Sequence, residues 1–493
     1  MELDSKTSKW LVDQKFFHGY LPREDLPYVL KKKGDYIVRT TERVTAKGRR
    51  KDIVLSIAWP VNPVAMIESK DIKNILIEQN ASACWIDLSM SFTTIGALFE
   101  HYRSNDIVSQ NKDRMRLTRP VGLLSWEFKH SRIQCVKKVG QGAYGEVYKG
   151  KVKKGNGKSF DAAIKAMRKD LEAGDEKMKE VMAEARLMRS LNHPNIVRCR
   201  GIAVLEQPLY IVIDFITGGG LDAFLKKNAA TLTVDDKNKM AISAAWGIEF
   251  MHSHDIIHRD IAARNCLYDK KNLVKLSDFG LSRKGRVYKM TKAMKMPTRW
   301  LAPESLTAFT FSRASDVYTY GVLLYEIYTC QEPYLGVNGN EVRNRILGGS
   351  FPNFEKHAPQ ELNNIIKNKV YQLDPAKRAS MSEIVKDLEQ WLEVELVLDE
   401  EEKPEECAES NKSILAAGNT SEDSHGKKKS KTSRKSQERI KPNDSPFSEP
   451  ATVTQKTLME KRAPRDVEEL APPEDDRKKA SPNETESMGE KKS

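Results

Sequence analysis

The chain has 493 residues and a formal net charge of +13, enough length for two compact domains and a further segment. Its six cysteines lack paired spacing, which argues against a disulfide framework or a zinc site and indicates reduced thiols. No signal peptide opens the sequence, and no apolar run reaches the roughly eighteen residues of a membrane-spanning helix.

The N-terminal region contains a buried cation on a predicted strand. In GDYIVR the residues alternate, so that Tyr36 and Val38 point one way while Ile37 and Arg39 point the other. A guanidinium on the inward face of a strand needs a strong anionic partner, and a phosphate that binds it through two hydrogen bonds fits best. A buried ion pair with a carboxylate is the alternative.

The order of the segments around Arg39 resembles that of an SH2 domain. It rests on five segments: FFHGYLPRED, GDYIVRTTE, IVLSIAW, IKNILIEQ and FTTIGALFEHY. The resemblance implies an antiparallel sheet flanked by two helices over residues 15–121, after an N-terminal extension, 1–14, and before a linker, 122–132. It also implies that Arg39, Arg23 and Thr41 bind phosphotyrosine.

Two positions depart from the SH2 pattern. Asn74 stands where the family often has His, and Leu76 where several members have Lys. Both changes reduce support for the phosphotyrosine ring and predict ordinary or weak affinity. The basic loop at 47–51 partly compensates by electrostatic attraction.

The run GQGAYGEV contains a glycine pattern with two interpretations. Gly140, Gly142 and Gly145 suit a loop that approaches phosphates, but the same spacing also opens dinucleotide-binding folds, where a helix follows. Here the next residues predict strand, turn and strand, ending at Lys165. We therefore expect a glycine hairpin.

A helix is predicted from Asp175 to Leu191, and it carries an acidic residue on its apolar stripe. Glu184 lies three residues after Val181 and four before Met188. An unpaired carboxylate in a core is costly, so Lys165 is the expected partner. The alternative is a rotated helix that leaves Glu184 in water.

Two further runs supply oxygen ligands and a proton acceptor. HRDIAARN places Asp260 and Asn265 five residues apart on a short loop, and VKLSDFG places Asp278 after a β-rich run. A carboxylate that takes a hydroxyl proton beside Mg²⁺ ligands is what phosphoryl transfer needs. Structural roles are expected for Asp316, which would hold the loop backbone, and for Arg378, which would pair with Glu304 of APE.

The full ordered set of motifs resembles a protein kinase from about Ile133 to Leu392, which implies a bilobal kinase fold at 133–395. The fold class is thus α+β and multidomain. The resemblance implies Asp260, Lys165, Glu184, Arg264 and Asn265 as catalytic residues, with Asn265 and Asp278 holding Mg²⁺ or alternatively Mn²⁺. It implies an ATP site with Ile213 as gatekeeper and with these residues: Val139, Gly140, Gly142, Gly145, Val147, Ala163, Lys165, Asp214 and Ile216.

Several residues resemble the tyrosine-specific type. Ala262 and Arg264 match the AAR form of the catalytic loop, and Pro297 and Trp300 match the loop that supports a phenolic acceptor. Tyr288 stands where such kinases carry an activating phosphosite. It lies among six basic residues, Arg283, Lys284, Arg286, Lys289, Lys292 and Lys295, so phosphate on Tyr288 would order a loop that otherwise repels itself. A solvated basic loop is the alternative.

The domain order resembles the Fps/Fer branch of cytoplasmic tyrosine kinases, without the membrane-curving N-terminal module of its long members. It implies a non-receptor tyrosine kinase that phosphorylates protein substrates and is recruited by its SH2 domain to phosphotyrosine-bearing partners. In this branch the SH2 domain typically supports the active kinase. A phosphotyrosine scaffold with an inert kinase domain and a serine/threonine kinase are the alternatives.

The last segment, 396–493, is predicted to be a disordered charged tail. From residue 401 it carries 19 Lys and Arg against 20 Asp and Glu with Phe447 as its single aromatic, so the net positive charge belongs to the preceding domains. Its basic cluster from Lys427 suits a nuclear signal or a lipid-binding patch, but a solvated charge run is the simpler interpretation. We expect a cytoplasmic protein with at most peripheral membrane association, no nucleic-acid partner and no obligate oligomer.

Overall fold

The structure is a computed structural model that describes residues 5–45, 48–62, 65–80, 82–87, 89–108, 114–142, 145–155, 157–167, 175–269, 273–292, 294–397 and 468–470. The chain divides into two units, Met1–Lys403 with Glu468–Ser493, and Pro404–Val467. All the described residues belong to the first unit. None of the helices in these ranges is long and apolar enough to cross a membrane.

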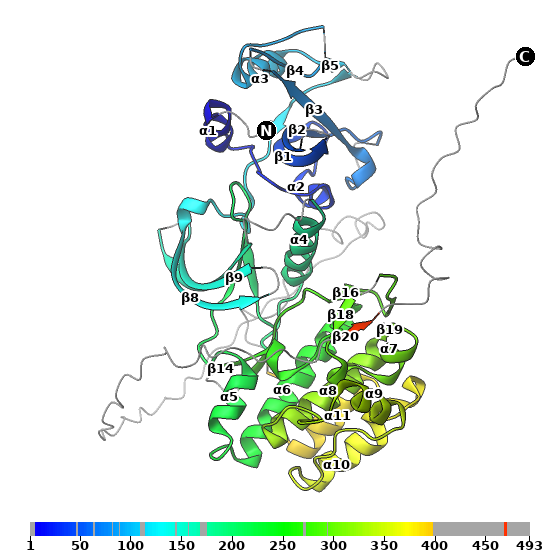
Figure 1. Cartoon of the computed structure of the whole chain (residues 1–493). Coiled ribbons are helices and arrows are strands. Elements are labelled where there is room, and N and C mark those ends of the chain that lie inside the picture. Colours follow the sequence, from blue (N-terminus) through cyan, green and yellow to red (C-terminus); the bar gives the residue numbers. More distant parts are fainter. Residues whose placement is uncertain are drawn as a thin grey trace, which may run out of the picture. The chain divides into compact units, whose positions relative to one another are not determined.

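The N-terminal part is built on a five-stranded sheet in the order β4-β3-β2-β1-β7 (Figure 1). Strands β1 to β4 pair antiparallel, and β7 joins β1 in parallel. The elements are α1 (Ser5–Asp13), a 3-10 turn (Arg23–Asp25), α2 (Leu26–Val29), β1 (Asp35–Thr45), β2 (Gly48–Ala58), a 3-10 turn (Ser69–Asp71), β3 (Ile72–Gln79), β4 (Cys84–Trp85), α3 (Ile95–Ser104), β5 (Ile107–Val108), β6 (Arg114–Met115) and β7 (Arg119–Pro120).

Strand β1 shows the alternation that its sequence predicts. Tyr36 and Val38 enter the core under α3, whereas Ile37 joins the apolar cluster that includes α2. Helix α1 belongs to the same core as α3: Leu11 is fully buried, and Trp10 stacks on Phe99 with ring centroids 5.8 Å apart. The described part of the expected extension therefore packs as part of this domain.

The linker is held by hydrogen bonds on both sides. His18 from the N-terminal part contacts the linker through both ring nitrogens: Nδ1 lies 2.8 Å from Glu127 Oε1, and Nε2 lies 3.0 Å from the Val121 carbonyl oxygen. The side chains of His18 and Glu127 are both buried. On the other side, the backbone of Trp126 and Phe128 bonds to Ile202. The linker thus acts as an added strand-like segment beside β11.

The small lobe has a second five-stranded sheet in the order β11-β12-β10-β9-β8. Its elements are a 3-10 turn (His130–Arg132), β8 (Ile133–Gly142), β9 (Gly145–Lys153), β10 (Ser159–Met167), α4 (Asp175–Arg189), β11 (Cys199–Ala203) and β12 (Tyr210–Asp214). Because β8 and β9 pair directly across the glycine run, the predicted hairpin is confirmed and the helix-opening alternative is wrong.

The large lobe is mainly helical around the buried helices α6 and α8 (Figure 1). Its helices are α5 (Leu221–Asn228), α6 (Val234–Ser253), α7 (Pro303–Thr307), α8 (Arg313–Thr329), α9 (Gly339–Leu347), α10 (Gln360–Ile365), a π turn (Ile366–Val370) and α11 (Met381–Leu392), with 3-10 turns at Ala263–Asn265, Thr298–Trp300 and Pro375–Lys377. Its strands are β13 (Ile256–Ile257), β14 (Cys266–Asp269), β15 (Leu273–Leu276), β16 (Arg283–Lys284), β17 (Val287–Lys289), β18 (Met294–Met296) and β19 (Thr310–Ser312).

The described part of the tail contains a strand that its composition did not predict. Residues Glu468–Leu470 form β20, which pairs antiparallel with β18, so the expectation of disorder is wrong there. The reason is non-local, because β18 supplies the backbone edge that these residues use. Four predicted features lie outside the described residues: the rest of the tail from residue 398, the Lys427 cluster, Lys47 of the basic loop 47–51, and Tyr144 of the GQGAYGEV run.

Candidate active site

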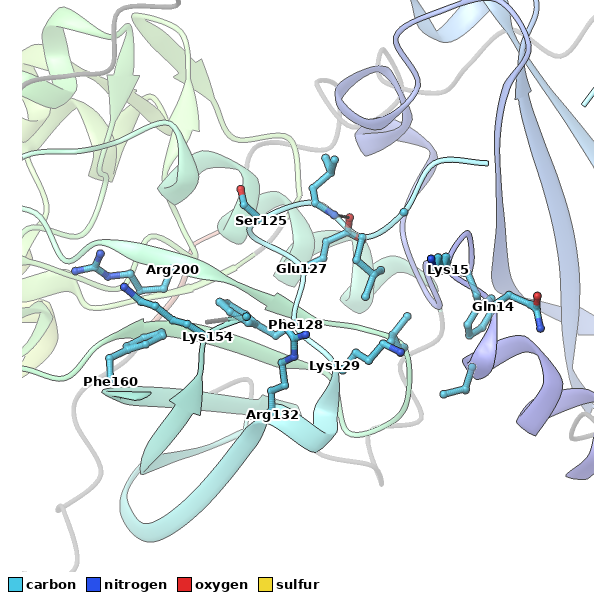
Figure 2. Close-up of a pocket in the computed structure, with 17 residues that line it drawn as sticks. Gln14, Lys15, Ser125, Glu127, Phe128, Lys129, Arg132, Lys154, Phe160 and Arg200 are labelled. Atoms are coloured by element: carbon cyan, nitrogen blue, oxygen red, sulfur yellow. Dashed lines mark hydrogen bonds between the residues drawn. The ribbon is translucent and has the colours of Figure 1, made fainter. Parts of the chain in front are cut away.

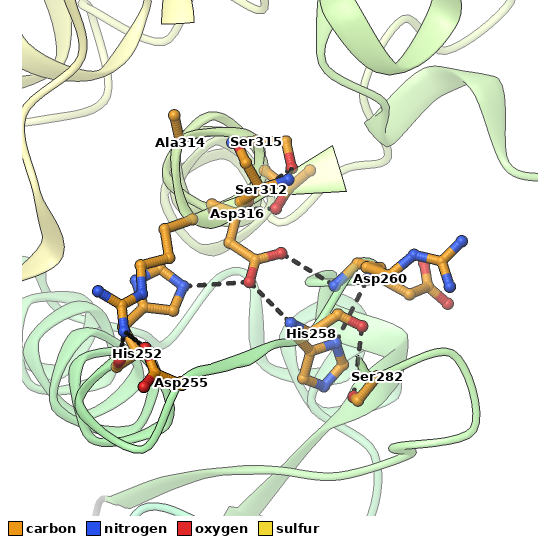
Figure 3. Close-up of polar contacts among 12 residues, drawn as sticks. His252, Asp255, His258, Asp260, Ser282, Ser312, Ala314, Ser315 and Asp316 are labelled. Atoms are coloured by element: carbon orange, nitrogen blue, oxygen red, sulfur yellow. Dashed lines mark hydrogen bonds and ion pairs between the residues drawn. The ribbon is translucent and has the colours of Figure 1, made fainter. Parts of the chain in front are cut away.

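The backbone of the HRDIAARN loop is fixed by one buried carboxylate. Asp316, at the start of α8, accepts hydrogen bonds from the His258 N–H (2.7 Å) and the Arg259 N–H (2.9 Å). Its Oδ2 also lies 3.1 Å from His252 Nε2, as Figure 3 shows. The predicted structural role of Asp316 is confirmed.

Asp260, Arg264 and Asn265 form one polar cluster. Arg264 donates to Asp260 Oδ1 through Nη2, and Asn265 Nδ2 donates to Asp260 Oδ2 at 2.6 Å and to the Asp260 carbonyl at 2.8 Å. These bonds use the amide nitrogen of Asn265, so its amide oxygen is the atom suited to a metal. The Arg264 guanidinium also lies 4.3 Å from the Trp300 ring centre.

Asp278 is brought close to this cluster by its neighbour in sequence. Ser277 donates to the Asn265 carbonyl through both its N–H and its hydroxyl, each at 2.8 Å. Asp278 itself is exposed and has a φ of 63°, a backbone conformation uncommon for aspartate. Carboxylate and amide oxygens are hard ligands of the kind that Mg²⁺ prefers, so the chemistry of Asp278 and Asn265 fits this ion.

The predicted ion pair between Lys165 and Glu184 is present in the structure. Lys165 Nζ lies 2.6 Å from Glu184 Oε1, and the Glu184 side chain is only 3% exposed. Val181, Ala185, Met188 and Leu191 are buried on the same stripe, so the rotated-helix alternative is wrong.

The other residues predicted for ATP lie on the paired strands of the small lobe. Val147 is opposite Lys165 and also opposite Gly140, while Ala163 is opposite Ile213, just before Asp214 ends β12. Ile216 follows that strand, Val139 is partly exposed on β8, and Gly142 faces Gly145 across the hairpin. A Cβ on Gly145 would meet the Ala166 carbonyl at 1.9 Å, so only glycine fits the strand there.

Two arginines lie close to the Tyr288 ring. It belongs to β17, which pairs with β19, and its ring centre is 4.2 Å from the Arg259 guanidinium and 5.6 Å from that of Arg283. Burial lowers the pKa of Arg259 to about 10. Within the described residues, Nε and Nη2 of Arg259 are buried without a hydrogen-bond partner.

Glu326 is a buried acidic residue that sequence reasoning missed. Its Oε2 accepts from the Ala263 N–H at 2.8 Å and from Trp300 Nε1 at 3.0 Å, so it joins the catalytic loop to the turn after β18. The signal was present in the sequence, because a glutamate within the apolar run YGVLLYEI is as anomalous as Glu184.

A second site lies in the N-terminal part, where Arg39, Arg23 and Thr41 line one pocket of about 510 Å³. Arg39 is 5% exposed and donates to Ser56 Oγ (3.2 Å) and Asn74 Oδ1 (3.1 Å). Leu76 also lines this pocket, as does Lys179 from α4 of the small lobe. Ser56 and Lys179 were not predicted.

A larger cavity of about 630 Å³ lies along the linker. Figure 2 shows linker residues Ser125 to Lys129 between Gln14 and Lys15 on one side and Lys154 and Phe160 on the other. Its lining includes none of the residues predicted for ATP, metal or phosphotyrosine.

Comparison with known proteins agrees with the geometry. Residues 133–388 match the family described as protein tyrosine and serine/threonine kinase. The chain is 31% identical over 387 residues to the tyrosine-protein kinase transforming protein Fps of avian sarcoma virus (strain PRCII), covering 78% of this chain and 68% of that protein.

Two cellular relatives are equally similar. Human tyrosine-protein kinase Fer is 30% identical over 391 residues, which cover 78% of this chain and 45% of Fer. Fer-related kinase 1 of Caenorhabditis elegans is 31% identical over 392 residues, which cover 79% of this chain and 97% of that protein.

The chain belongs to the protein kinase family. Within that family it is a protein-tyrosine kinase with Fps and Fer among its homologues.

Proposed function

We propose that the chain is a non-receptor kinase that transfers the ATP γ-phosphate to tyrosine hydroxyls of proteins, with Asp260 as the proton acceptor. The observation that carries this proposal is the contact of Asp260 with both Arg264 and Asn265. The bond to Asn265 holds the carboxylate in place. The Arg264 guanidinium, 4.3 Å from the Trp300 ring centre, supports a long aromatic acceptor beside Asp260.

The nucleotide is assigned to the small-lobe side of this cluster. Lys165, fixed by Glu184, binds the α- and β-phosphates; Gly140, Gly142 and Gly145 let the hairpin backbone approach them; and the adenine lies against Asp214–Ile216 with Val139, Val147 and Ala163. Mg²⁺ held by Asn265 and Asp278 neutralises phosphate charge when bound.

Asp260→Asn tests the enzyme. We expect kcat on a tyrosine peptide to fall roughly 10²- to 10⁴-fold, because the variant keeps the size of the side chain but cannot take the proton, and its amide nitrogen cannot accept one of the two hydrogen bonds that the carboxylate accepts. A mixture of Tyr, Ser and Thr peptides with Mg·ATP is the substrate, and Glu361→Gln on the surface is the matched control. Label confined to Ser or Thr contradicts the specificity, and no transfer by the wild type favours an inert scaffold.

Phosphorylation of Tyr288 is proposed to activate the kinase. Arg259 and Arg283 lie over the Tyr288 ring, and Arg259 has buried donor atoms without partners among the described residues. A phosphate on this ring would give those donors an acceptor.

The N-terminal part is proposed to be an SH2 domain that recruits the kinase to phosphotyrosine-bearing partners. Arg39 at the base of its pocket, with Arg23 and Thr41 beside it, would bind the phosphate. Arg39→Lys keeps the charge but loses the bidentate fork, so we expect the affinity for a phosphotyrosine peptide to fall roughly 10- to 100-fold. Equal binding in a calorimetric titration would exclude Arg39 as the anchor, and Arg103→Lys is the control.

A further inference from the structure

The pocket that contains Arg39 is lined in part by the kinase domain. Arg39, Arg23 and Thr41 come from the N-terminal part, whereas Lys179 comes from helix α4 of the small lobe. Lys179 is exposed, and within the described residues its ammonium group has no hydrogen-bond or ion-pair partner. This group is therefore available to a ligand that enters the pocket.

Helix α4 is held beside this pocket by contacts with the N-terminal part. Arg186 donates two hydrogen bonds of 2.9 Å to Asp25, which is 1% exposed. Lys179 precedes Arg186 by seven residues, close to two helical turns, so both side chains project from the same face of α4. The face that binds Asp25 thus also presents Lys179, and the 3-10 turn that ends at Asp25 begins with Arg23 of the pocket.

The N-terminal part alone gives the pocket little positive charge. Glu24 lines the pocket together with Arg39 and Arg23, so two arginines and one glutamate leave a single positive charge in excess. A phosphotyrosine carries about −1.5 to −2 charges at pH 7. With Lys179 the excess is two positive charges, which balances the charge of the phosphate dianion.

Strand β3 adds no charge to the pocket. Its lining residues are Asn74 and Leu76. The Asn74 side-chain oxygen accepts hydrogen bonds from Arg39 Nη2 (3.1 Å) and Ser56 Oγ (2.8 Å), so Asn74 orients the Arg39 guanidinium. The weak affinity expected from Asn74 and Leu76 therefore applies to the N-terminal part alone, and a cation from α4 would raise it.

We propose that Lys179 of the kinase domain completes the phosphotyrosine site, so that Arg39, Arg23 and Lys179 bind the phosphate together. This rests on the proposed SH2 function of the N-terminal part. Arg39, which is 5% exposed, binds from the buried base of the pocket, and Lys179 adds its charge from the side of the kinase. The site that recognises a phosphorylated partner is therefore shared between the two domains, and its affinity depends on α4 as well as on the N-terminal part.

Removing the ammonium group in the full-length chain tests this assignment. At about 0.05 M salt, Lys179→Met is expected to lower the affinity for a phosphotyrosine peptide roughly 3- to 10-fold in a calorimetric titration. Lys179→Arg keeps the charge and should bind as the wild type does, and Lys227→Met, on the exposed surface of α5, is the control. At about 0.5 M salt the loss should shrink, because salt screens a contact between exposed charges. Wild-type affinity of Lys179→Met at low salt, or a loss that is the same at both salt concentrations, overturns the proposal.

A cation placed on strand β3 tests whether Lys179 acts on the phosphate itself. Leu76→Lys adds an ammonium group to the same pocket from the N-terminal part. The added group should raise the affinity of the Lys179→Met protein roughly threefold or more and that of the wild type less, because the wild-type pocket already balances the charge of the phosphate. Equal gains in the two proteins would mean that positions 76 and 179 do not share one ligand, and would overturn the proposal.

Chemical acetylation of lysines in the wild-type chain separates this proposal from the proposed function. A saturating phosphotyrosine peptide should slow the acetylation of Lys179 severalfold and leave that of Lys227 unchanged, and the unphosphorylated peptide should slow neither. Acetylation of Lys179 at the same rate with and without the phosphotyrosine peptide overturns the proposal. If Arg39→Lys still weakens binding in that case, the SH2 function stands without a contribution from α4. A wild type that binds no phosphotyrosine peptide overturns both.

Discussion

At the scale of single residues, burial and hydrogen bonding shift the pKa of Glu326 in opposite directions. Burial raises the pKa of Glu326 to about 7, although the hydrogen bond from Ala263 and the nearby Arg264 lower it. The folded protein therefore binds a proton at Glu326 between about pH 4.5 and 7, where an unfolded chain has lost it.

This difference predicts a pH-dependent stability. The contribution of Glu326 to the free energy of unfolding is fully present below about pH 4.5 and is lost as the pH rises to about 7. Glu326→Gln keeps an oxygen that can accept from Ala263 and Trp300 but does not titrate. The wild type should therefore lose roughly 2–3 kcal/mol of unfolding free energy between pH 5 and 7.5 that the variant does not lose. Urea unfolding at pH 5 and 7.5 measures this, and an equal loss in both proteins would refute it. Glu361→Gln, on the surface, is the control.

Tyr288 gives a second prediction at the residue scale. Tyr288→Phe keeps the ring over Arg259 and Arg283 but cannot carry phosphate. Before incubation with Mg·ATP, we expect the variant and the wild type to be equally active. After incubation, the activity of the wild type should rise roughly tenfold or more, whereas that of the variant should not rise. Time courses of peptide phosphorylation check this beside Tyr28→Phe, and a full rise in Tyr288→Phe would rule out Tyr288 as the activating site.

At the scale of elements, one buried ion pair ties helix α7 to the loop before α11. Arg378 Nη1 and Nη2 lie 2.7 and 2.8 Å from the two Glu304 oxygens, and Arg378 is 7% exposed. Arg378 also donates to the carbonyls of Gln372 and Ala314. The predicted pair is thus confirmed, and it holds the end of the activation segment against the large lobe.

Removing the Arg378 guanidinium should destabilise the fold, because the Glu304 carboxylate and the carbonyls of Gln372 and Ala314 lose their hydrogen-bond donor. Arg378→Met is expected to lower the free energy of unfolding by roughly 3–5 kcal/mol. Arg345→Met breaks a half-exposed ion pair with Glu341 and should change the free energy of unfolding by less than about 1 kcal/mol. Denaturant unfolding compares the two variants, and similar losses would contradict the role given to the buried pair.

The sequence predicted what depends on local pattern or on one obvious partner. The β8–β9 hairpin follows from glycine spacing, and the Lys165–Glu184 contact follows from a carboxylate on an apolar stripe. It did not predict β20, because three residues of a charged tail form a strand only where β18 offers an edge. Nor did it predict the stacking of Arg259 on Tyr288, which depends on how β17 lies against the catalytic loop.

At the scale of the whole molecule, helix α4 carries contacts of two kinds. Glu184 binds Lys165 on one side, while Arg186 binds Asp25 through two hydrogen bonds of 2.9 Å and the Arg189 guanidinium lies 3.6 Å from the Trp126 ring centre. Asp25 is 1% exposed. Helix α4 therefore links the Lys165–Glu184 pair to Asp25 of the N-terminal part.

Asp25→Asn should weaken this coupling and lower kinase activity without touching the active site. The variant leaves the Arg186 guanidinium without its carboxylate, so α4 moves more easily and Glu184 holds Lys165 for less of the time. We expect kcat/KM for ATP to fall roughly tenfold. Glu24→Gln, the exposed neighbour, is the control. Wild-type kinetics in Asp25→Asn would show that the active arrangement of α4 does not depend on this ion pair.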